Sequence, residues 1–212
     1  MARPLFDDGF RENFRELLAW RRDVRSFRPD PLPDGLLEEL LGLTRLAPSV
    51  GLSEPWRFVH VRGKKTREEI RAEFERSNAE ALSGYEGSRA ALYSRLKLAG
   101  LDCCPVQLAV FADRATSKGH GLGRRTMPEM LEYSVIGAIH ILWLAARAHG
   151  VGMGWVSILD PERVSITLEV PADWRLVAYL CLGYPEEEST TPALQQAGWE
   201  TRDGQSTLLL ER

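Results

Sequence analysis

The sequence predicts a single domain with a layered α+β fold. Its 212 residues are 44% hydrophobic, which is enough for one substantial core. Predicted helices and strands are mixed without the regular β-α-β alternation of a parallel sheet. One helix, expected over residues 128–149, is apolar nearly all round and should therefore lie in the centre of the core.

Hydrophobic periodicity and turn signals predict the individual elements. The segment "FRENFRELLAW" (10–20) repeats apolar residues at helical spacing. Pro33 and Asp34 start a helix over 34–46, which stops before Pro48. The alternation in "WRFVHV" predicts a strand over 56–61. The other expected elements are helices over 64–82, 88–99, 128–149 and 161–170, and strands over 105–112, 153–158 and 174–183.

Charge and cysteine usage exclude several classes of protein. The 27 Lys and Arg residues are balanced by 30 Asp and Glu residues, which gives no reason to expect nucleic-acid binding. No apolar run approaches the roughly 20 residues of a membrane span, and "MARPLFDDGFREN" lacks the apolar core of a signal peptide. Cys103, Cys104 and Cys181 make neither a disulfide framework nor a zinc site. We therefore expect a cytoplasmic protein without a metal.

The last segment, residues 186–212, is long and polar but still contains apolar anchors. Trp199 and the run Leu208–Leu210 are the residues that stand out. A polar tail with such anchors is expected to lie against a partner surface.

The stretch "AWRRDVRSF" (19–27) places Asp23 inside a cluster of three arginines. Guanidinium groups bind phosphate well, so Arg21, Arg22 and Arg25 suit an anion, whereas Asp23 would repel one. The structural alternative is a basic helix end that complements the helix dipole.

Three further segments are candidate sites, each with a structural alternative. In "RLAPSVGLSEPW", Ser49 and Gly51 could contact a flat ligand or form an ordinary helix-to-strand loop. In "GMGWVSI", Gly154 and Ser157 could belong to a site or to a tight turn. In "AGWETRD", Arg202 could reach a phosphate or remain solvated.

In this order, the four segments resemble the FMN-dependent nitroreductase superfamily. With "YSRLKLAG" and "GRRTMPEM", they resemble its branch that makes 5,6-dimethylbenzimidazole, the lower ligand of cobalamin, and the resemblance covers about residues 10–203. It implies a nitroreductase-like fold with a central mixed or antiparallel sheet, and an intertwined homodimer with FMN at the subunit interface. Residues 75–100 would form a lid-like helical region, and 186–212 an arm toward the partner subunit.

The resemblance also assigns roles to residues. The arginines would hold the phosphate and the polar ring edge of FMN, the segment after Pro48 would line the ring pocket, and the lid would contribute two contacts. The implied FMN-binding residues are Arg21, Arg22, Asp23, Val24, Arg25, Ser49, Val50, Gly51, Leu96, Lys97, Gly154, Ser157 and Arg202.

The loop after Pro48 departs from the superfamily pattern at two positions. Leu52 and Glu54 stand where ordinary nitroreductases often carry Asn and Gln. Leu52 would make the substrate face more apolar. Glu54 would be unfavourable beside an anionic flavin, so we expect it to turn away.

The implied reaction consumes reduced FMN with O2 and yields 5,6-dimethylbenzimidazole and erythrose 4-phosphate, with Asp23 and Ser157 as catalytic residues. The flanking arginines are expected to lower the pKa of Asp23 and keep it ionised. A separate flavin reductase would supply the reduced FMN. Two alternatives stay open: an NAD(P)H-dependent FMN nitroreductase or flavin reductase, and a non-catalytic flavin-binding protein.

Overall fold

The computed structural model describes residues 5–94, 100–204 and 209–211. Within these residues, four strands form one antiparallel sheet in the order β1-β2-β4-β3. The strands are β1 (Trp56–His60), β2 (Val106–Asp113), β3 (Gly152–Val156) and β4 (Trp174–Gly183). The α+β prediction is therefore confirmed, and the sheet is antiparallel throughout.

The two central strands contribute the largest numbers of buried residues to the sheet. Every residue of β2 except Asp113 is buried, and the last six residues of β4 are buried as well. Strands covered on both faces are continuous apolar runs, and "PVQLAVFAD" has this pattern. The register between β2 and β4 shifts between Val110 and Phe111, where a β-bulge increases the local twist.

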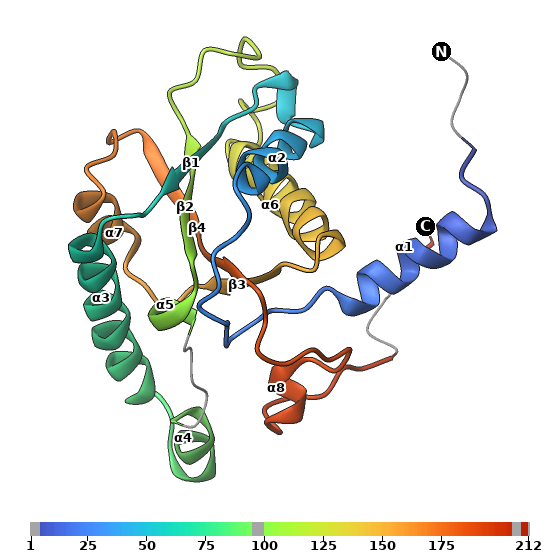
Figure 1. The fold of residues 1–212 in the computed structure, drawn as a ribbon. Coiled ribbons are helices and arrows are strands. Elements are labelled where there is room, and N and C mark those ends of the chain that lie inside the picture. The colour runs from blue at the N-terminus through green and yellow to red at the C-terminus, as the bar shows by residue number, and fades with distance from the viewer. Residues whose placement is uncertain (1–4, 95–99, 205–208, 212) are drawn as a thin grey trace.

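Helices cover both faces of the sheet (Figure 1). On one face, α2 (Leu36–Leu43) and α6 (Met130–Ala148) pack in a core cluster that includes Leu40, Leu142 and Leu180. On the other face, α3 (Lys64–Leu82), α5 (Gly100–Cys103) and α7 (Pro161–Thr167) lie beside a second cluster. Its members include Phe27, Ile70, Phe111 and Tyr179.

Helix α6 is a core helix on one side only. Seven of its residues are buried, among them Val135 and Leu142. Its other side carries Tyr133 and Ile136, which are 54% and 40% exposed. By length and composition it could cross a membrane, but its buried side packs in the core cluster that contains β2 and β4. The expected packing of α6 in the core is confirmed for one side of the helix, and the described residues leave its other side uncovered.

Three helices lie outside these layers. Helix α1 (Asp8–Trp20) is capped by Asp7, whose Oδ1 accepts the Phe10 N–H at 2.8 Å, and it buries none of its residues. Helix α4 (Gly87–Tyr93) forms the first part of the helix predicted over 88–99, and residues 95–99 are outside the described chain. Helix α8 (Ala193–Gln196) lies in the C-terminal segment and was not predicted.

Most predicted elements are confirmed with small changes at their ends. Helix α3 covers 64–82 as expected. The helix predicted over 34–46 ends at Leu43 and continues as a 3-10 turn, η1 (Thr44–Leu46), which is followed by a second turn, η2 (Val50–Leu52). Cys104 and Cys181 are free and buried, and the described residues contain no cluster suited to a metal ion.

Candidate functional site

The arginine segment lies against the outer edge of β3, the last strand of the sheet. The Val24 N–H donates a hydrogen bond of 3.0 Å to the Met153 carbonyl, and Asp23 and Met153 form a parallel bridge. Residues 23 and 24 therefore extend the sheet beyond its last strand. This contact fixes the backbone positions from which the side chains of the arginine cluster extend.

Two glycines of β3 make this close approach feasible. A Cβ atom at Gly154 would stand 2.1 Å from the Val24 carbonyl oxygen, and one at Gly152 would stand 2.7 Å from the Val24 Cγ2. Both distances are too short for a side chain. The glycines of "GMGWVSI" are thus required for packing of the arginine segment, which is a more specific role than a tight turn.

Asp23 is held by the backbone of β3. Its Oδ1 accepts the Trp155 N–H at 2.9 Å, and its Oδ2 lies 3.8 Å from the Arg25 Nε. Burial raises the pKa of Asp23 above its ordinary value, and the Trp155 N–H, Arg25 and Arg21 offset the shift only in part. The side chain is still 39% exposed, so one side of the carboxyl remains open. The arginines do lower this pKa, but desolvation outweighs them, so the expected net lowering of the Asp23 pKa is wrong.

Arg202, from the C-terminal segment, comes close to Arg21 and Arg22 beside Asp23. The Arg22 Nε donates to the Thr190 carbonyl at 2.7 Å, and the Arg21 guanidinium lies 4.9 Å from the centre of the Trp143 ring. Burial and then the charge of Arg202 lower the pKa of both Arg21 and Arg22. The first and last segments therefore bring like charges together, which is the arrangement that an anion would stabilise.

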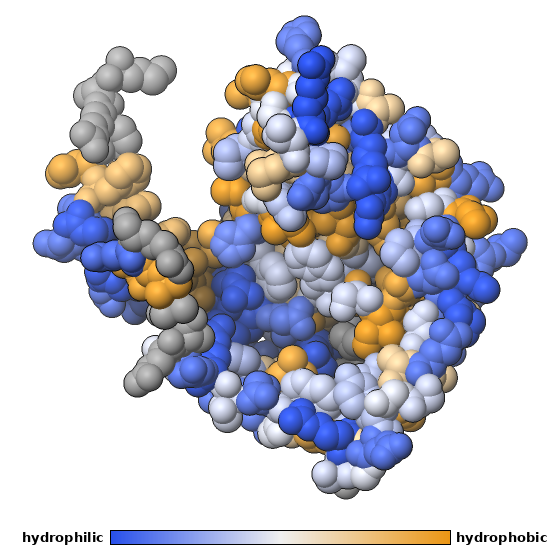
Figure 2. Space-filling model, turned by 180° about the vertical axis from the view of Figure 1, so that it is seen from behind, coloured by the Kyte–Doolittle hydropathy of each residue, from blue (hydrophilic) through white to orange (hydrophobic). Residues whose placement is uncertain are grey.

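A cavity of about 260 Å³ opens beside these residues. The space-filling view of Figure 2 shows the molecule hollowed on its rear face. The Arg25 Nε is buried and has no hydrogen-bond partner among the described residues. A buried donor without a partner is unfavourable, so the cavity suits a ligand with both an anionic group and a polar acceptor. The cavity is lined by Arg22, Asp23, Val24, Arg25, Ser26, Glu186, Glu187, Ser189, Thr191, Ala193 and Gln196.

The segment with Ser49 lies elsewhere in the chain. The Val50 N–H donates to the Ser134 Oγ at 3.0 Å, near the start of α6. By contrast, the Trp143 Nε1 donates to the Arg22 carbonyl at 3.2 Å, nearer the end of that helix. Nine helical residues separate the two contacts, or about 14 Å along the axis. The structure therefore does not bring Ser49, Val50 and Gly51 to the arginine cluster within one chain.

A second loop supports the Ser49 segment. Gly51 has a φ of 56°, and a Cβ atom there would stand 2.9 Å from the Gly119 carbonyl oxygen. Glu54 pairs with Lys118 in the same loop, which gives its carboxylate a partner within the protein. Leu52 is 73% exposed. Residues 49–54 are thus a rigid platform with an exposed apolar side chain.

The remaining predicted residues have simpler positions. Ser157 follows the end of β3, two residues after the N–H that binds Asp23; it is exposed, and its hydroxyl has no hydrogen-bond partner within the described chain. Arg202 is exposed, and its backbone N–H lies 3.5 Å from the Gln195 Oε1. Leu96 and Lys97 lie outside the described residues.

The structure adds residues that the sequence did not single out. Glu73 on α3 is one: its Oε1 accepts the Asp160 N–H at 3.2 Å and the Ser77 hydroxyl at 2.8 Å, so it holds the segment that follows Ser157. Burial raises the pKa of Glu73, but hydrogen bonds from Arg76, Ser77 and the Asp160 N–H lower it below its ordinary value. The only sequence signal for this role is that Glu73 stands at a position of α3 where the helical spacing predicts a buried apolar residue.

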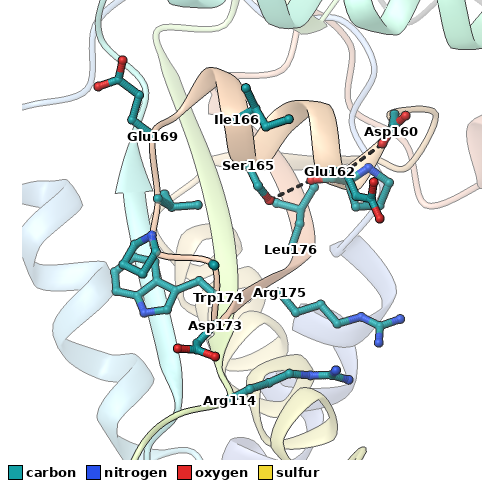
Figure 3. A pocket seen from close by; sticks show the side chains of 14 residues that line it. Arg114, Asp160, Glu162, Ser165, Ile166, Glu169, Asp173, Trp174, Arg175 and Leu176 are labelled. Atoms are coloured by element: carbon teal, nitrogen blue, oxygen red, sulfur yellow. Dashed lines mark hydrogen bonds between the residues drawn. The ribbon is translucent and has the colours of Figure 1, made fainter.

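A larger cavity, of about 820 Å³, lies between α7 and the start of β4 (Figure 3). Trp174 and Ile166 contribute apolar surface there. Arg114 is already neutralised by Glu132, whose Oε1 lies 2.6 Å from its Nη2. None of the predicted site residues lines this cavity, so its size does not make it the site.

Comparison with known proteins identifies the family of this chain. The family model described as "Nitroreductase family" matches residues 18–184. A protein of Rhodospirillum rubrum named 5,6-dimethylbenzimidazole synthase is 54% identical over 94% of each chain. One of Rhodobacter capsulatus with the same name is 48% identical, over 92% of this chain and 94% of its own.

A solved structure of iodotyrosine deiodinase, bound to FMN and 3-iodo-L-tyrosine, has the same fold with a TM-score of 0.71. It is 23% identical, and the match covers 93% of this chain and 97% of that one. The chain therefore belongs to the nitroreductase family, and within it to the group of the 5,6-dimethylbenzimidazole synthases.

Proposed function

We propose that this protein converts reduced FMN and O2 into 5,6-dimethylbenzimidazole and erythrose 4-phosphate. The two relatives named 5,6-dimethylbenzimidazole synthase match the chain over nearly its whole length. The observation that carries the proposal is the Asp23 carboxyl, held by the Trp155 N–H inside an arginine cluster. A protein that only binds FMN does not need a carboxyl among the arginines, because the carboxylate would repel the anionic ligand.

The arginines are the proposed binding groups. Arg21, Arg22 and Arg202 take the phosphate, because the phosphate neutralises charges that now repel one another. The Arg25 Nε takes a polar acceptor on the flavin, since it is buried and has no hydrogen-bond partner among the described residues. Reduced FMN, when bound, supplies the carbon skeleton of the product and the electrons that reduce O2.

Asp23 and Ser157 are the proposed proton-handling groups. The raised pKa brings Asp23 closer to the pH at which a carboxylate is an effective base. Asp23 accepts a proton near the ribityl C1′, and its bond to the Trp155 N–H holds the other lone pairs toward the cavity. The Ser157 hydroxyl is free to donate or accept a hydrogen bond there.

A homodimer completes the proposed site. Nitroreductase-family proteins are typically dimers, and α1 carries an uncovered apolar face with Phe10 and Phe14, which are 48% and 44% exposed. Tyr133 and Ile136 on α6 are similarly uncovered. A second copy would bury these faces and bring its own Ser49 segment to the arginine cluster of the first. Leu209 and Leu210, which are 82% and 63% exposed, suit the arm of residues 186–212 for the same partner surface.

The region from 75 to 100 is the proposed lid over the ring. A closed lid excludes water and also a nicotinamide, so reduced FMN would come from a separate cytoplasmic flavin reductase. The described part of this region consists of the end of α3, α4 and the start of α5.

The test is a direct assay for the product. Purified protein is mixed with chemically reduced FMN, exposed to air, and analysed for 5,6-dimethylbenzimidazole by liquid chromatography and mass spectrometry. We expect one benzimidazole for each FMN consumed. Recovery of intact oxidised FMN alone would reject the proposal, and rapid NAD(P)H oxidation with a nitroaromatic would identify an ordinary nitroreductase.

A further inference from the structure

The helix α4 and the turn before it hold the ring of Trp199, from the C-terminal segment. The Tyr85 ring centre lies 4.8 Å from that of Tyr93, and it meets Trp199 edge-on at 5.5 Å. Tyr93 lies 6.2 Å from Trp199. The Arg89 guanidinium lies 5.2 Å from the Trp199 ring centre, and its Nη1 donates to the Trp199 carbonyl at 3.3 Å. We refer to Tyr85, Arg89, Tyr93 and Trp199 as the aromatic clasp.

The clasp has specific geometry although its members are not part of the core. Tyr85 is 37% exposed, and no residue of α4 is buried. Edge-on and offset aromatic pairs and a cation over a ring face are each favourable arrangements. The Tyr93 hydroxyl also donates to the Asn78 Oδ1 at 2.9 Å, which ties α4 to the end of α3. Trp199 therefore contacts α4 and the turn before it, and α4 is in turn bonded to α3.

The C-terminal segment that carries Trp199 also contributes to the arginine site. The Trp199 N–H donates to the Leu194 carbonyl at 2.9 Å, so Trp199 is fastened to α8. Arg202 follows three residues later, and its N–H lies 3.5 Å from the Gln195 Oε1 of the same helix. Before α8, the Thr190 carbonyl accepts the Arg22 Nε at 2.7 Å. A short, internally bonded segment thus connects the arginines to the clasp.

We propose that the aromatic clasp couples phosphate binding to the closure of the lid, with Trp199 as the positioning residue. The inference rests on the proposed function, because the phosphate is that of FMN. A phosphate between Arg202 and the N-terminal arginines replaces repulsion by attraction and draws Arg202 inward. Trp199 and Arg202 are both bonded to α8, and the aromatic clasp joins Trp199 to α4. Helix α4 therefore moves with Arg202 and covers the flavin ring only when the phosphate is in place.

This coupling gives the reaction a selection step. A ligand with the flavin ring but no phosphate, such as riboflavin, occupies the ring site without closing the lid. Its reduced ring then remains open to water and is oxidised by O2 without fragmentation. The phosphate, far from the reacting atoms, thereby decides whether the ring is enclosed.

The experiment is hydrogen exchange on the full-length protein, followed by mass spectrometry of peptides from residues 78–94 and 19–27. Wild-type protein is compared alone, with FMN and with riboflavin. We expect FMN to slow exchange in both peptides, and riboflavin to leave 78–94 unchanged. Trp199→Leu and Arg202→Gln should abolish the slowing in 78–94, whereas Trp199→Phe should keep most of it. Arg175→Gln, an exposed arginine on β4, is the matched control and should behave as wild type.

The two peptides separate failure of the coupling from failure of the function. If FMN slows exchange in 19–27, but 78–94 is equally slowed in wild type and in the Trp199→Leu variant, the clasp does not couple the two regions. An absence of FMN-induced slowing in 78–94 of the wild type would overturn the inference in the same way. If FMN slows exchange in neither peptide, both the inference and the FMN site are wrong.

Discussion

The Trp155 backbone N–H donates a hydrogen bond of 2.9 Å to the Asp23 Oδ1, and so joins the arginine segment to the strand that precedes Ser157. The bond orients the carboxyl through one oxygen only, and the second oxygen faces the Arg25 Nε at 3.8 Å, beyond hydrogen-bond distance. The two residues assigned to proton handling are thus positioned by one strand, although 132 residues separate the bonded partners.

Asp23→Asn should preserve FMN binding and remove product formation. The Asn oxygen can still accept the Trp155 N–H, but the amide cannot take a proton. Loss of a general base typically lowers the rate by roughly 10²–10⁴-fold. Single-turnover formation of 5,6-dimethylbenzimidazole from reduced FMN is the measurement, with the FMN dissociation constant as the control. An unchanged rate would remove Asp23 from the mechanism.

The raised pKa of Asp23 predicts a specific pH dependence of stability. The folded protein binds the Asp23 proton more tightly than the unfolded chain does, so ionisation lowers stability as the pH rises from the ordinary pKa of 3.8 through the folded value. The Asp23→Asn variant does not lose stability in this way, because its amide does not ionise. The melting temperature of the variant minus that of the wild type should therefore be larger at pH 7 than at pH 4. The opposite trend would mean that the arginines win over desolvation.

Gly154→Ala should displace the arginine segment from β3. The new Cβ atom would stand 2.1 Å from the Val24 carbonyl oxygen. That oxygen belongs to the backbone and the Cβ position is fixed by the backbone, so neither atom can turn aside. Overpacking of this kind costs about 1–3 kcal/mol or more. Thermal unfolding and FMN titration should both show a loss. Gly204→Ala is the control, because nothing lies within 4 Å of its Cβ position.

Arg202→Gln should weaken FMN binding and leave the ligand-free protein at least as stable. A charge-assisted hydrogen bond contributes about 1.5–3 kcal/mol, which corresponds to a roughly ten- to hundredfold loss of affinity. The variant also removes a charge that repels Arg21 and Arg22. Riboflavin affinity should not change. Equal losses for FMN and riboflavin would place Arg202 away from the phosphate.

Phe14→Asp should break the homodimer and with it the FMN site. A carboxylate in the apolar face of α1 cannot be buried without a partner. Sedimentation should show monomers that retain the helical spectrum of the wild type. Ile166→Asp replaces an equally apolar side chain that is 76% exposed on α7 and should leave the dimer intact. A dimeric Phe14→Asp protein would assign the uncovered face to something else.

Local patterns were sufficient for much of the fold and for the identity of the candidate residues. Helix α3 follows from its charged, helical run, and the buried β2 follows from its apolar run. What the sequence could not give is tertiary proximity. The contact between Arg22 and Thr190 spans 168 residues, and no local signal marks a carbonyl oxygen as its acceptor.

The direction of the Asp23 pKa shift was mispredicted for a similar reason. Three neighbouring arginines are visible in the sequence, but the desolvation that outweighs them depends on β3 and on the C-terminal segment. The position of Ser49 could not be predicted from the sequence either. Only the hydrogen bond from the Val50 N–H to the Ser134 Oγ shows which end of α6 the Ser49 segment lies against.

The separation of the Ser49 segment from the arginine cluster along α6 has a genetic consequence. In the proposed dimer, each site takes its arginines from one chain and its Ser49 segment from the other. Two inactive variants, one damaged at Arg25 and one at Ser49, would then complement each other when co-expressed. Each hybrid dimer would contain one doubly damaged site and one intact site, and activity would return although neither chain is functional alone.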